Sequence, residues 1–254
     1  KESQRRQRQL KFQILKNLIL NAGLRYDTYE TFGSTINPRL ALIYTPWTNT
    51  TIKLIYGEAF RTTNVYELYF YDESTSEASL NLQPEKIKAS EIIIEQYIGK
   101  NLLISVSGFY YKIKDLISQQ TDPVDGFAVF RNVENIHSGG MAFEIKKHYE
   151  SGLEGRASYS FQETRDEQTG QILTNSPKHL AKVNMIVPLI KEKLFLGLEE
   201  QYMSKRRTLA DRESGAFFIT NLTLYSRQLM KGMELSGSVY NLFDETYSDP
   251  AGAE

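Results

Sequence analysis

Residues 18–27, LILNAGLRYD, place an apolar side chain at every second position. The even positions hold Leu, Leu, Ala, Leu and Tyr, whereas the odd positions include Asn21, Arg25 and Asp27. A period of two is the period of a β-strand, because a helix with 3.6 residues per turn would mix the two sets on one face. The stretch therefore predicts a strand that has one apolar and one polar face.

The same alternation returns along the chain, for example at residues 153–162 (LEGRASYSFQ) and 233–241 (MELSGSVYN). Many of the predicted strands reach ten residues or more, which is longer than the usual strand of a soluble sheet. Short polar turns such as 99–101 alternate with long loops such as 62–85. These features predict an all-β fold and are typical of an antiparallel transmembrane β-barrel. About twelve strands are expected, near residues 9–15, 18–30, 37–46, 50–61, 86–98, 101–115, 128–148, 152–163, 178–188, 193–206, 215–227 and 232–242.

The composition excludes several classes of protein. The 30 Lys and Arg against 31 Asp and Glu give a net charge of −1, which argues against a nucleic acid as the main partner. The absence of Cys excludes a disulfide framework, a zinc-thiolate site and a cysteine nucleophile. Mean hydropathy is −0.42, and this value is compatible with a membrane barrel because only every second residue of its strands faces lipid.

We expect one domain, preceded by a short segment of different composition. Residues 1–9, KESQRRQRQ, are basic and show no apolar alternation, so we expect a basic N-terminal tail there. Residues 10–254 show no linker or low-complexity segment and are expected to form one continuous sheet.

The polar faces of the predicted strands carry charges of both signs at regular positions. Such a face fits a hydrated, salt-bridged barrel interior. It also fits the solvated face of a soluble antiparallel sheet, so this alternative stays open. The charged and amide residues on these faces are Arg25, Asp27, Arg39, Lys53, Glu91, Glu95, Glu154, Arg156, Lys182 and Asn184.

The sequence shows no pattern typical of catalysis. His137, His148 and His179 are too scattered to suggest a metal site, and no local signature accompanies a possible Ser-His-Asp set. We therefore expect no catalytic residues, no metal site and no cofactor. The pair Gly139-Gly140 lacks the GxxxxGK pattern of a phosphate loop, and it predicts a close backbone approach or a bend in a strand.

Six segments, in this order, resemble those of TonB-dependent outer-membrane receptors. One of them, GEAFRTTNVYEL, differs from the pattern of that family by having Thr63 where Pro is usual. The segments are 24–27 (LRYD), 57–68 (GEAFRTTNVYEL), 81–85 (NLQPE), 130–133 (FRNV, followed by Gly140 and Glu144), 175–179 (NSPKH) and 239–247 (VYNLFDETY).

This resemblance implies the C-terminal part of a 22-stranded barrel, without the plug domain and the last strand. It implies an active transport receptor in the bacterial outer membrane, energised through TonB, that imports a ferric siderophore or similar iron chelate, cobalamin or haem. The implied partners are outer-membrane lipid and lipopolysaccharide, the TonB complex through the plug domain, and a small-molecule metal chelate or vitamin.

Candidate ligand contacts are the loop residues Arg61, Tyr66, Tyr69, Tyr71 and Arg131, chosen by loop position and chemistry. The tyrosines of this set could instead pack the loop against itself and the strand ends. Two other functions stay open: a soluble antiparallel β-sheet acting as a binding module or adhesin, and an outer-membrane enzyme barrel.

Overall fold

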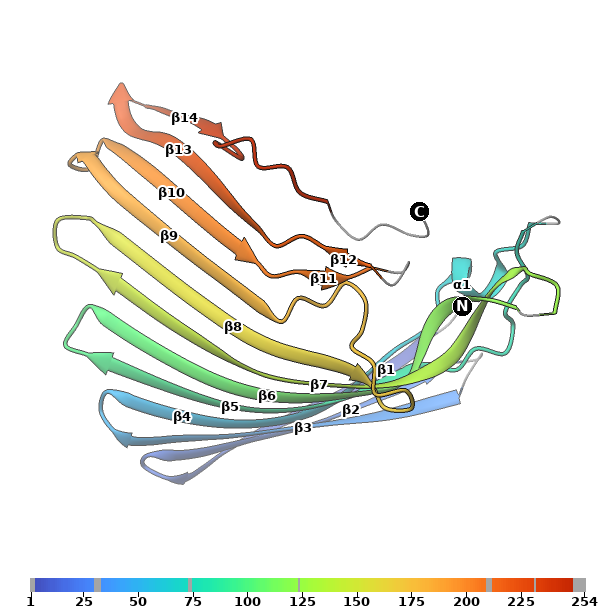
Figure 1. Cartoon of the computed structure of the whole chain (residues 1–254). Coiled ribbons are helices and arrows are strands. Elements are labelled where there is room, and N and C mark those ends of the chain that lie inside the picture. The colour runs from blue at the N-terminus through green and yellow to red at the C-terminus, as the bar shows by residue number, and fades with distance from the viewer. Residues whose placement is uncertain are drawn as a thin grey trace.

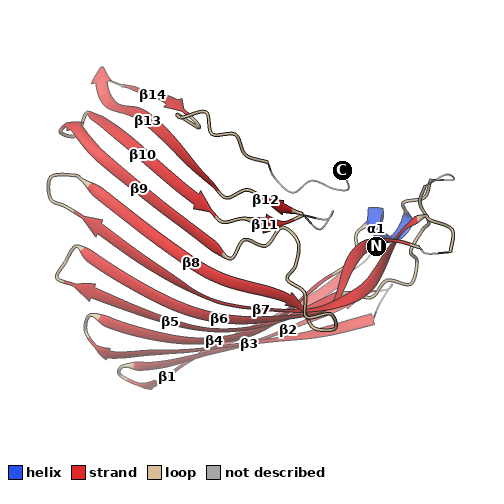
Figure 2. Ribbon diagram, viewed as in Figure 1, coloured by secondary structure: helices blue, strands red, loops and turns tan. Residues whose placement is uncertain are grey.

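The computed structural model describes residues 3–29, 33–72, 75–122, 124–208, 212–230 and 232–248. Twelve strands form one antiparallel sheet in which each strand pairs with the next along the chain, apart from a small hairpin inserted before the last two. The sheet curves like part of a barrel wall, and its edge strands β1 and β14 lie apart (Figure 1). Short turns gather at one end of the sheet and the long loops at the other, as the turn lengths predict (Figure 2).

The strand bounds follow the predicted ones within a few residues along most of the chain. The strands of the large sheet are β1 (Ser3–Leu15), β2 (Leu18–Tyr29), β3 (Gly33–Trp47), β4 (Thr50–Arg61), β5 (Glu85–Ile98), β6 (Leu102–Thr121), β7 (Ala128–His148), β8 (Glu154–Asp166), β9 (His179–Ile190), β10 (Leu194–Met203), β13 (Phe217–Met230) and β14 (Met233–Val239).

Three elements differ from the predictions. β1 begins at Ser3, so residues 3–9, which we expected in a tail, pair with β2 instead. That stretch has no apolar residue, so its alternation could not be seen in the sequence. The helix α1 (Val65–Tyr69) was not predicted, and neither was the hairpin of β11 (Arg206–Arg207) and β12 (Glu213–Ser214), although Arg206 was expected as the last residue of the preceding strand. Among the described residues, no helix is long and apolar enough to cross a membrane.

The two faces of the sheet differ in chemistry. Register partners on neighbouring strands share a face, and Leu54 lies opposite Ile92 on the outer, convex face. Leu54 is 46% exposed and Ile92 is 43% exposed, because no second layer covers this face in the described part of the chain. The inner, concave face carries ion pairs such as Lys53 with Glu95 at 2.7 Å. An uncovered apolar face and a charged inner face are the reverse of a soluble sandwich.

Among the described residues, a small hydrophobic core forms at the loop end. Leu68 of α1 packs with Leu82 and Ile117, and Phe130 lies against this cluster. The cluster fixes the long loop between β4 and β5 onto the strands below it.

Candidate functional site

The helix α1 lies in the long loop that holds three of the five predicted ligand contacts. Its N-cap is Asn64, whose side-chain oxygen accepts a hydrogen bond from the Glu67 backbone N–H at 2.7 Å. The Glu67 carboxylate in turn accepts from the Asn64 backbone N–H at 2.9 Å. This capping box satisfies two backbone donors that a helix start leaves without partners. It explains why so short a helix forms there.

Arg61 joins this helix to the sheet. Its Nε and Nη2 donate to the two carboxylate oxygens of Glu85, each at 2.6 Å. Its Nη1 donates to Glu67 at 2.8 Å. Glu85 also accepts from the Ile117 backbone N–H at 2.9 Å. One guanidinium therefore holds the end of β4, α1 and the start of β5 together, and Glu85 extends the link to β6. We call Arg61, Glu67 and Glu85 the rim clamp.

The pKa values of Arg61 and Glu85 in the rim clamp shift in the directions that favour their charged forms. The hydrogen bonds that Arg61 donates to Glu85 and Glu67 raise the pKa of Arg61 above its ordinary value. Burial acts to raise the pKa of Glu85, but the Arg61 hydrogen bonds and the Ile117 N–H oppose it, and the net pKa is below the usual 4.5. Arg61 is the last residue of β4 and Glu85 is the first residue of β5, so both groups lie at the loop end of the sheet. The charged form of Glu85 is therefore the one that the fold stabilises.

This shift predicts a loss of stability in acid. A carboxylate whose pKa is lower in the folded state stabilises the fold above its unfolded pKa, and that stability is lost as the pH falls through the folded pKa. We expect the loss to begin near pH 4.5 and to continue below it. The test compares urea midpoints at pH 6 and pH 3 in the wild type and in Glu85→Gln. The wild type should lose more than the variant; equal losses would contradict the prediction.

Asn132 ties the same region together with hydrogen bonds. Its side-chain nitrogen donates to the carbonyl oxygens of Gln83 at 2.8 Å and Asp115 at 2.7 Å, and its side-chain oxygen accepts from the Gln83 N–H at 2.7 Å. Asp115 has φ of 57°, in the left-handed region, beside the irregularity where β6 pairs with β7. Three of the segments that carry the family resemblance, 57–68, 81–85 and 130–133, thus meet in space and support the loop.

The predicted tyrosines divide into two groups. Tyr66 stacks on Phe70, with ring centroids 4.4 Å apart, and its ring meets Phe130 edge-on at 5.8 Å. It packs the loop, as the alternative interpretation had it, although it remains half exposed. Tyr69 is 53% exposed and Tyr71 is 62% exposed, and both offer aromatic contact surface at the loop end.

The two predicted arginines both pair with carboxylates of this chain. Arg61 is held in the rim clamp, and Arg131 forms an ion pair with Asp122. Both hold the loop end together, and their contact with a ligand stays a prediction. The sequence reading missed Glu67, Glu85 and Asn132 as supporting residues. The Asn64-x-x-Glu67 spacing before Leu68 was a signal for the capping box.

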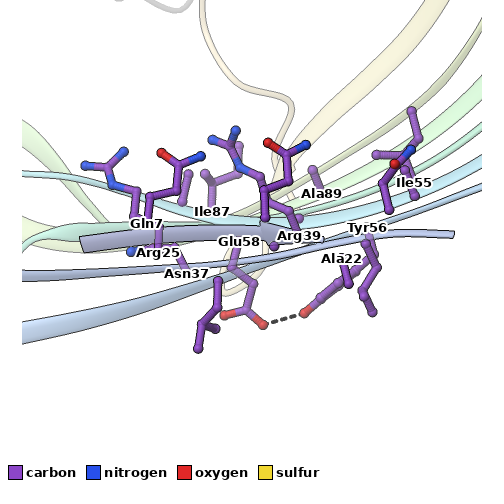
Figure 3. A pocket seen from close by; sticks show the side chains of 18 of the residues that line it. Gln7, Ala22, Arg25, Asn37, Arg39, Ile55, Tyr56, Glu58, Ile87 and Ala89 are labelled. Carbon is purple, nitrogen blue, oxygen red and sulfur yellow. Dashed lines mark hydrogen bonds between the residues drawn. The ribbon is translucent and has the colours of Figure 1, made fainter. Parts of the chain in front are cut away.

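A second candidate region is a groove on the inner face of β1 to β5, with a volume of ≈ 520 Å³. Figure 3 shows Gln7 and Arg39 on one side of the sheet, and Tyr56 with Glu58 on the other. The groove is lined by Arg5, Arg25 and Arg39, and the Arg25 Nε pairs with Asp27 at 2.6 Å. We call it the inner-face groove. Three guanidinium groups line the groove, and the Glu58 carboxylate among its lining residues lies on the other side of the sheet, so the groove suits an anionic ligand.

Comparisons with known proteins agree with this architecture. The sequence model of the family described as TonB dependent receptor-like, beta-barrel matches residues 8–242. The vitamin B12 transporter BtuB of Vibrio cholerae is 25% identical over 245 residues, which cover 92% of this chain and 37% of that protein.

Solved structures show the same fold. A mutant of the ferric enterobactin receptor PfeA from Pseudomonas aeruginosa superposes with a TM-score of 0.82 at 18% identity, over 96% of this chain and 40% of that one. The ferric-catecholate import receptor Fiu from E. coli gives a TM-score of 0.74 at 16% identity, over 96% of this chain and 41% of that one. The chain thus spans well under half the length of these proteins. The predicted fold class, an antiparallel and here partial β-barrel, is confirmed.

Proposed function

The chain belongs to the family of TonB dependent receptor-like β-barrels, and from this premise we propose that it forms part of the barrel wall, with the loops at one end, of an active transport receptor in the bacterial outer membrane. The family and the relatives above are transport receptors rather than enzymes, so no covalent chemistry is required of its residues. The uncovered apolar outer face supports placement in a membrane, because exposed Leu54 and Ile92 would be costly in water. Energy would come through TonB.

The substrate proposed here is a small anionic metal chelate of the ferric siderophore type, with cobalamin or haem as other members of the class. The observation that carries this choice is the inner-face groove, which is lined by three guanidinium groups, those of Arg5, Arg25 and Arg39. Exposed Tyr69 and Tyr71 add flat aromatic surface at the loop end, suited to the ring systems of such ligands. Substrate would first meet the tyrosines and then pass along the polar inner face.

A double substitution tests the loop contact. We expect Tyr69→Ser with Tyr71→Ser, made in the full-length receptor, to weaken binding of ferric enterobactin about tenfold, because exposed aromatic anchors carry a large share of binding energy. The barrel should still assemble, since neither ring belongs to the buried cluster. Binding is measured by titration of the purified receptor. Tyr149→Ser, which alters a 46% exposed ring at the short-turn end, is the control and should bind normally. Unchanged affinity in the double variant would refute the contact.

Uptake decides between the substrates. Cells that depend on this receptor should take up labelled ferric enterobactin, and uptake should stop when TonB is deleted. Uptake of cyanocobalamin in place of the iron chelate would move the assignment to a vitamin. Uptake of neither, by a receptor that is correctly assembled, would overturn the proposed substrate class.

A further inference from the structure

The guanidinium of Arg25 in the inner-face groove is held by a carboxylate from its own strand. Arg25 and Asp27 stand two residues apart on β2, so their side chains project from the same face of the sheet. The Arg25 Nε lies 2.6 Å from one carboxylate oxygen of Asp27, and its Nη2 donates to the other oxygen at 3.0 Å. Two contacts to one carboxylate fix the plane of the guanidinium as well as its position.

An aromatic ring from another strand also contacts this guanidinium. The Arg25 Cζ lies over the ring of Phe60, 5.5 Å from its centroid. The Phe60 ring in turn meets the Tyr29 ring edge-on, with the two centroids 5.7 Å apart. A guanidinium over an aromatic face is attracted by the electrons of the ring. Arg25 is therefore restrained from two strands, by Asp27 on β2 and by Phe60 on β4.

Burial separates the role of Asp27 from that of Arg25. The Asp27 side chain is 2% exposed, and Asp27 is not among the residues that line the groove. The Arg25 side chain is 28% exposed and does line it. The pair uses Nε and Nη2 of Arg25, so the N–H groups of Nη1 take no part in it. An anion in the groove can therefore reach Arg25 but not the carboxylate that holds it.

The other two arginines of the groove are less restrained. Arg5 and Arg39 are exposed, and no ion pair joins either of them to a carboxylate within the residues that the structure describes. The Arg5 Nη2 donates to the amide oxygen of Gln7 at 3.2 Å. A mobile side chain loses conformational freedom when it binds a ligand, and this loss weakens the binding. Arg25 has already lost much of that freedom in the folded sheet.

We propose that Asp27 and Phe60 are positioning residues, which aim the Arg25 guanidinium at an oxyanion group of the substrate in the inner-face groove. Arg25 fixes the orientation of the bound anion, while Arg5 and Arg39 add positive charge. The inference rests on the proposed function, because it needs an anionic substrate in this groove. Its prediction is opposite to that of charge counting: removal of the Asp27 carboxylate makes the groove more positive, yet anion binding weakens.

The test measures the affinity for ferric enterobactin of the full-length receptor and its variants. Asp27→Asn should bind about tenfold more weakly than the wild type, which is the loss expected for about one hydrogen bond to a charged group. Arg25→Gln should lose about as much. Adding Asp27→Asn to Arg25→Gln should cost little more, because Asp27 acts through Arg25. Unchanged or tighter binding by Asp27→Asn would overturn the proposal, and so would two losses that simply add in the double variant.

Two further variants separate positioning from folding. Phe60→Leu keeps every charge, and it should assemble and bind about threefold more weakly. It decides the question if Asp27→Asn fails to assemble, since unchanged affinity in Phe60→Leu would then overturn the proposal. Glu154→Gln removes a 47% exposed carboxylate at the short-turn end and is the matched control. It should bind as the wild type does, and a loss equal to that of Asp27→Asn would also refute the positioning role.

A chemical readout keeps this inference separate from the choice of substrate. Phenylglyoxal modifies accessible guanidinium groups, and mass spectrometry follows its reaction with Arg25. The modification should be several-fold faster in Asp27→Asn and in Phe60→Leu than in the wild type, because each variant releases the side chain. Equal rates would overturn the positioning role. A wild type that binds no ferric enterobactin, but shows these differences in rate, would count against the proposed substrate alone.

Discussion

Replacing Gly140 with valine is expected to keep the sheet from assembling across β6, β7 and β8. A Cβ at this position would lie 2.4 Å from the Phe161 carbonyl oxygen and 2.5 Å from Cζ of the Phe109 ring. The first of these atoms belongs to the backbone of a paired strand and cannot rotate away. Overpacking of this kind costs about 3 kcal/mol or more. The folded fraction in outer membranes, measured by the heat-modifiable migration of folded barrels in gels, should fall sharply.

A matched glycine variant shows whether the lack of space at Gly140 causes the failure of assembly. Gly155 lies on β8, and a Cβ there would meet nothing within 4 Å. Gly155→Val should therefore assemble normally, because a branched side chain suits an open strand position. Adding Phe109→Ala to the Gly140→Val chain should restore only part of the folded fraction, since the Phe161 oxygen remains in the way. Normal assembly of Gly140→Val alone would show that the strands can separate without cost.

The fold was largely predictable because the two-residue period of a β-strand is visible in the sequence as alternating apolar and polar residues. Residues 18–27 were predicted as strand and form most of β2, and the close approach expected at Gly139-Gly140 is confirmed at Gly140. The sequence could not say which face is inside, since a period of two is the same from either side. The structure places Arg25 in the inner-face groove and leaves Leu54 and Ile92 exposed on the other face.

The candidate site was less predictable, because its residues act through neighbours that are distant in the chain. Arg61 was chosen as an exposed loop cation, yet its main partner, Glu85, follows 24 positions later. Asn132 is separated by 49 positions from Gln83. Periodicity describes each strand separately and carries no information on which side chains meet at the strand ends. The tyrosines were easier to select, but only the structure separates packed Tyr66 from the more exposed Tyr71.

The rim clamp joins the loop between β4 and β5 to the strand ends by ion pairs. Glu67 and Glu85 are each 10% exposed at the side chain, and they meet a guanidinium that is 45% exposed. Glu67 of the clamp lies in the same loop as the exposed rings of Tyr69 and Tyr71, so the clamp ties the segment that presents them to the strand ends. A binding surface on a fixed base loses less conformational entropy when a ligand arrives.

Arg61→Gln is accordingly expected to loosen the whole loop between β4 and β5. The substitution leaves two nearly buried carboxylates without their cation, which costs much more than losing an exposed pair. We expect a loss of about 2 kcal/mol, between the values for exposed and fully buried pairs. Chymotrypsin should then cut within residues 62–84, which contain several Tyr and Phe, much faster than in the wild type. Arg61→Lys should recover only part of the protection, because an ammonium cannot match both oxygens of Glu85.

The same substitution decides whether Arg61 supports the loop or contacts the ligand. In the clamp interpretation, adding Glu67→Gln and Glu85→Gln to Arg61→Gln removes the uncompensated charges, so protection from chymotrypsin and ligand affinity should both return in part. If Arg61 contacts the ligand, the triple variant would regain protection while its affinity stays low. Arg165→Gln, which breaks the exposed pair with Glu163, is the matched control and should leave both protection and affinity unchanged, because exposed ion pairs contribute little. Slow cleavage and weak binding in Arg61→Gln itself would sink the clamp and establish direct contact.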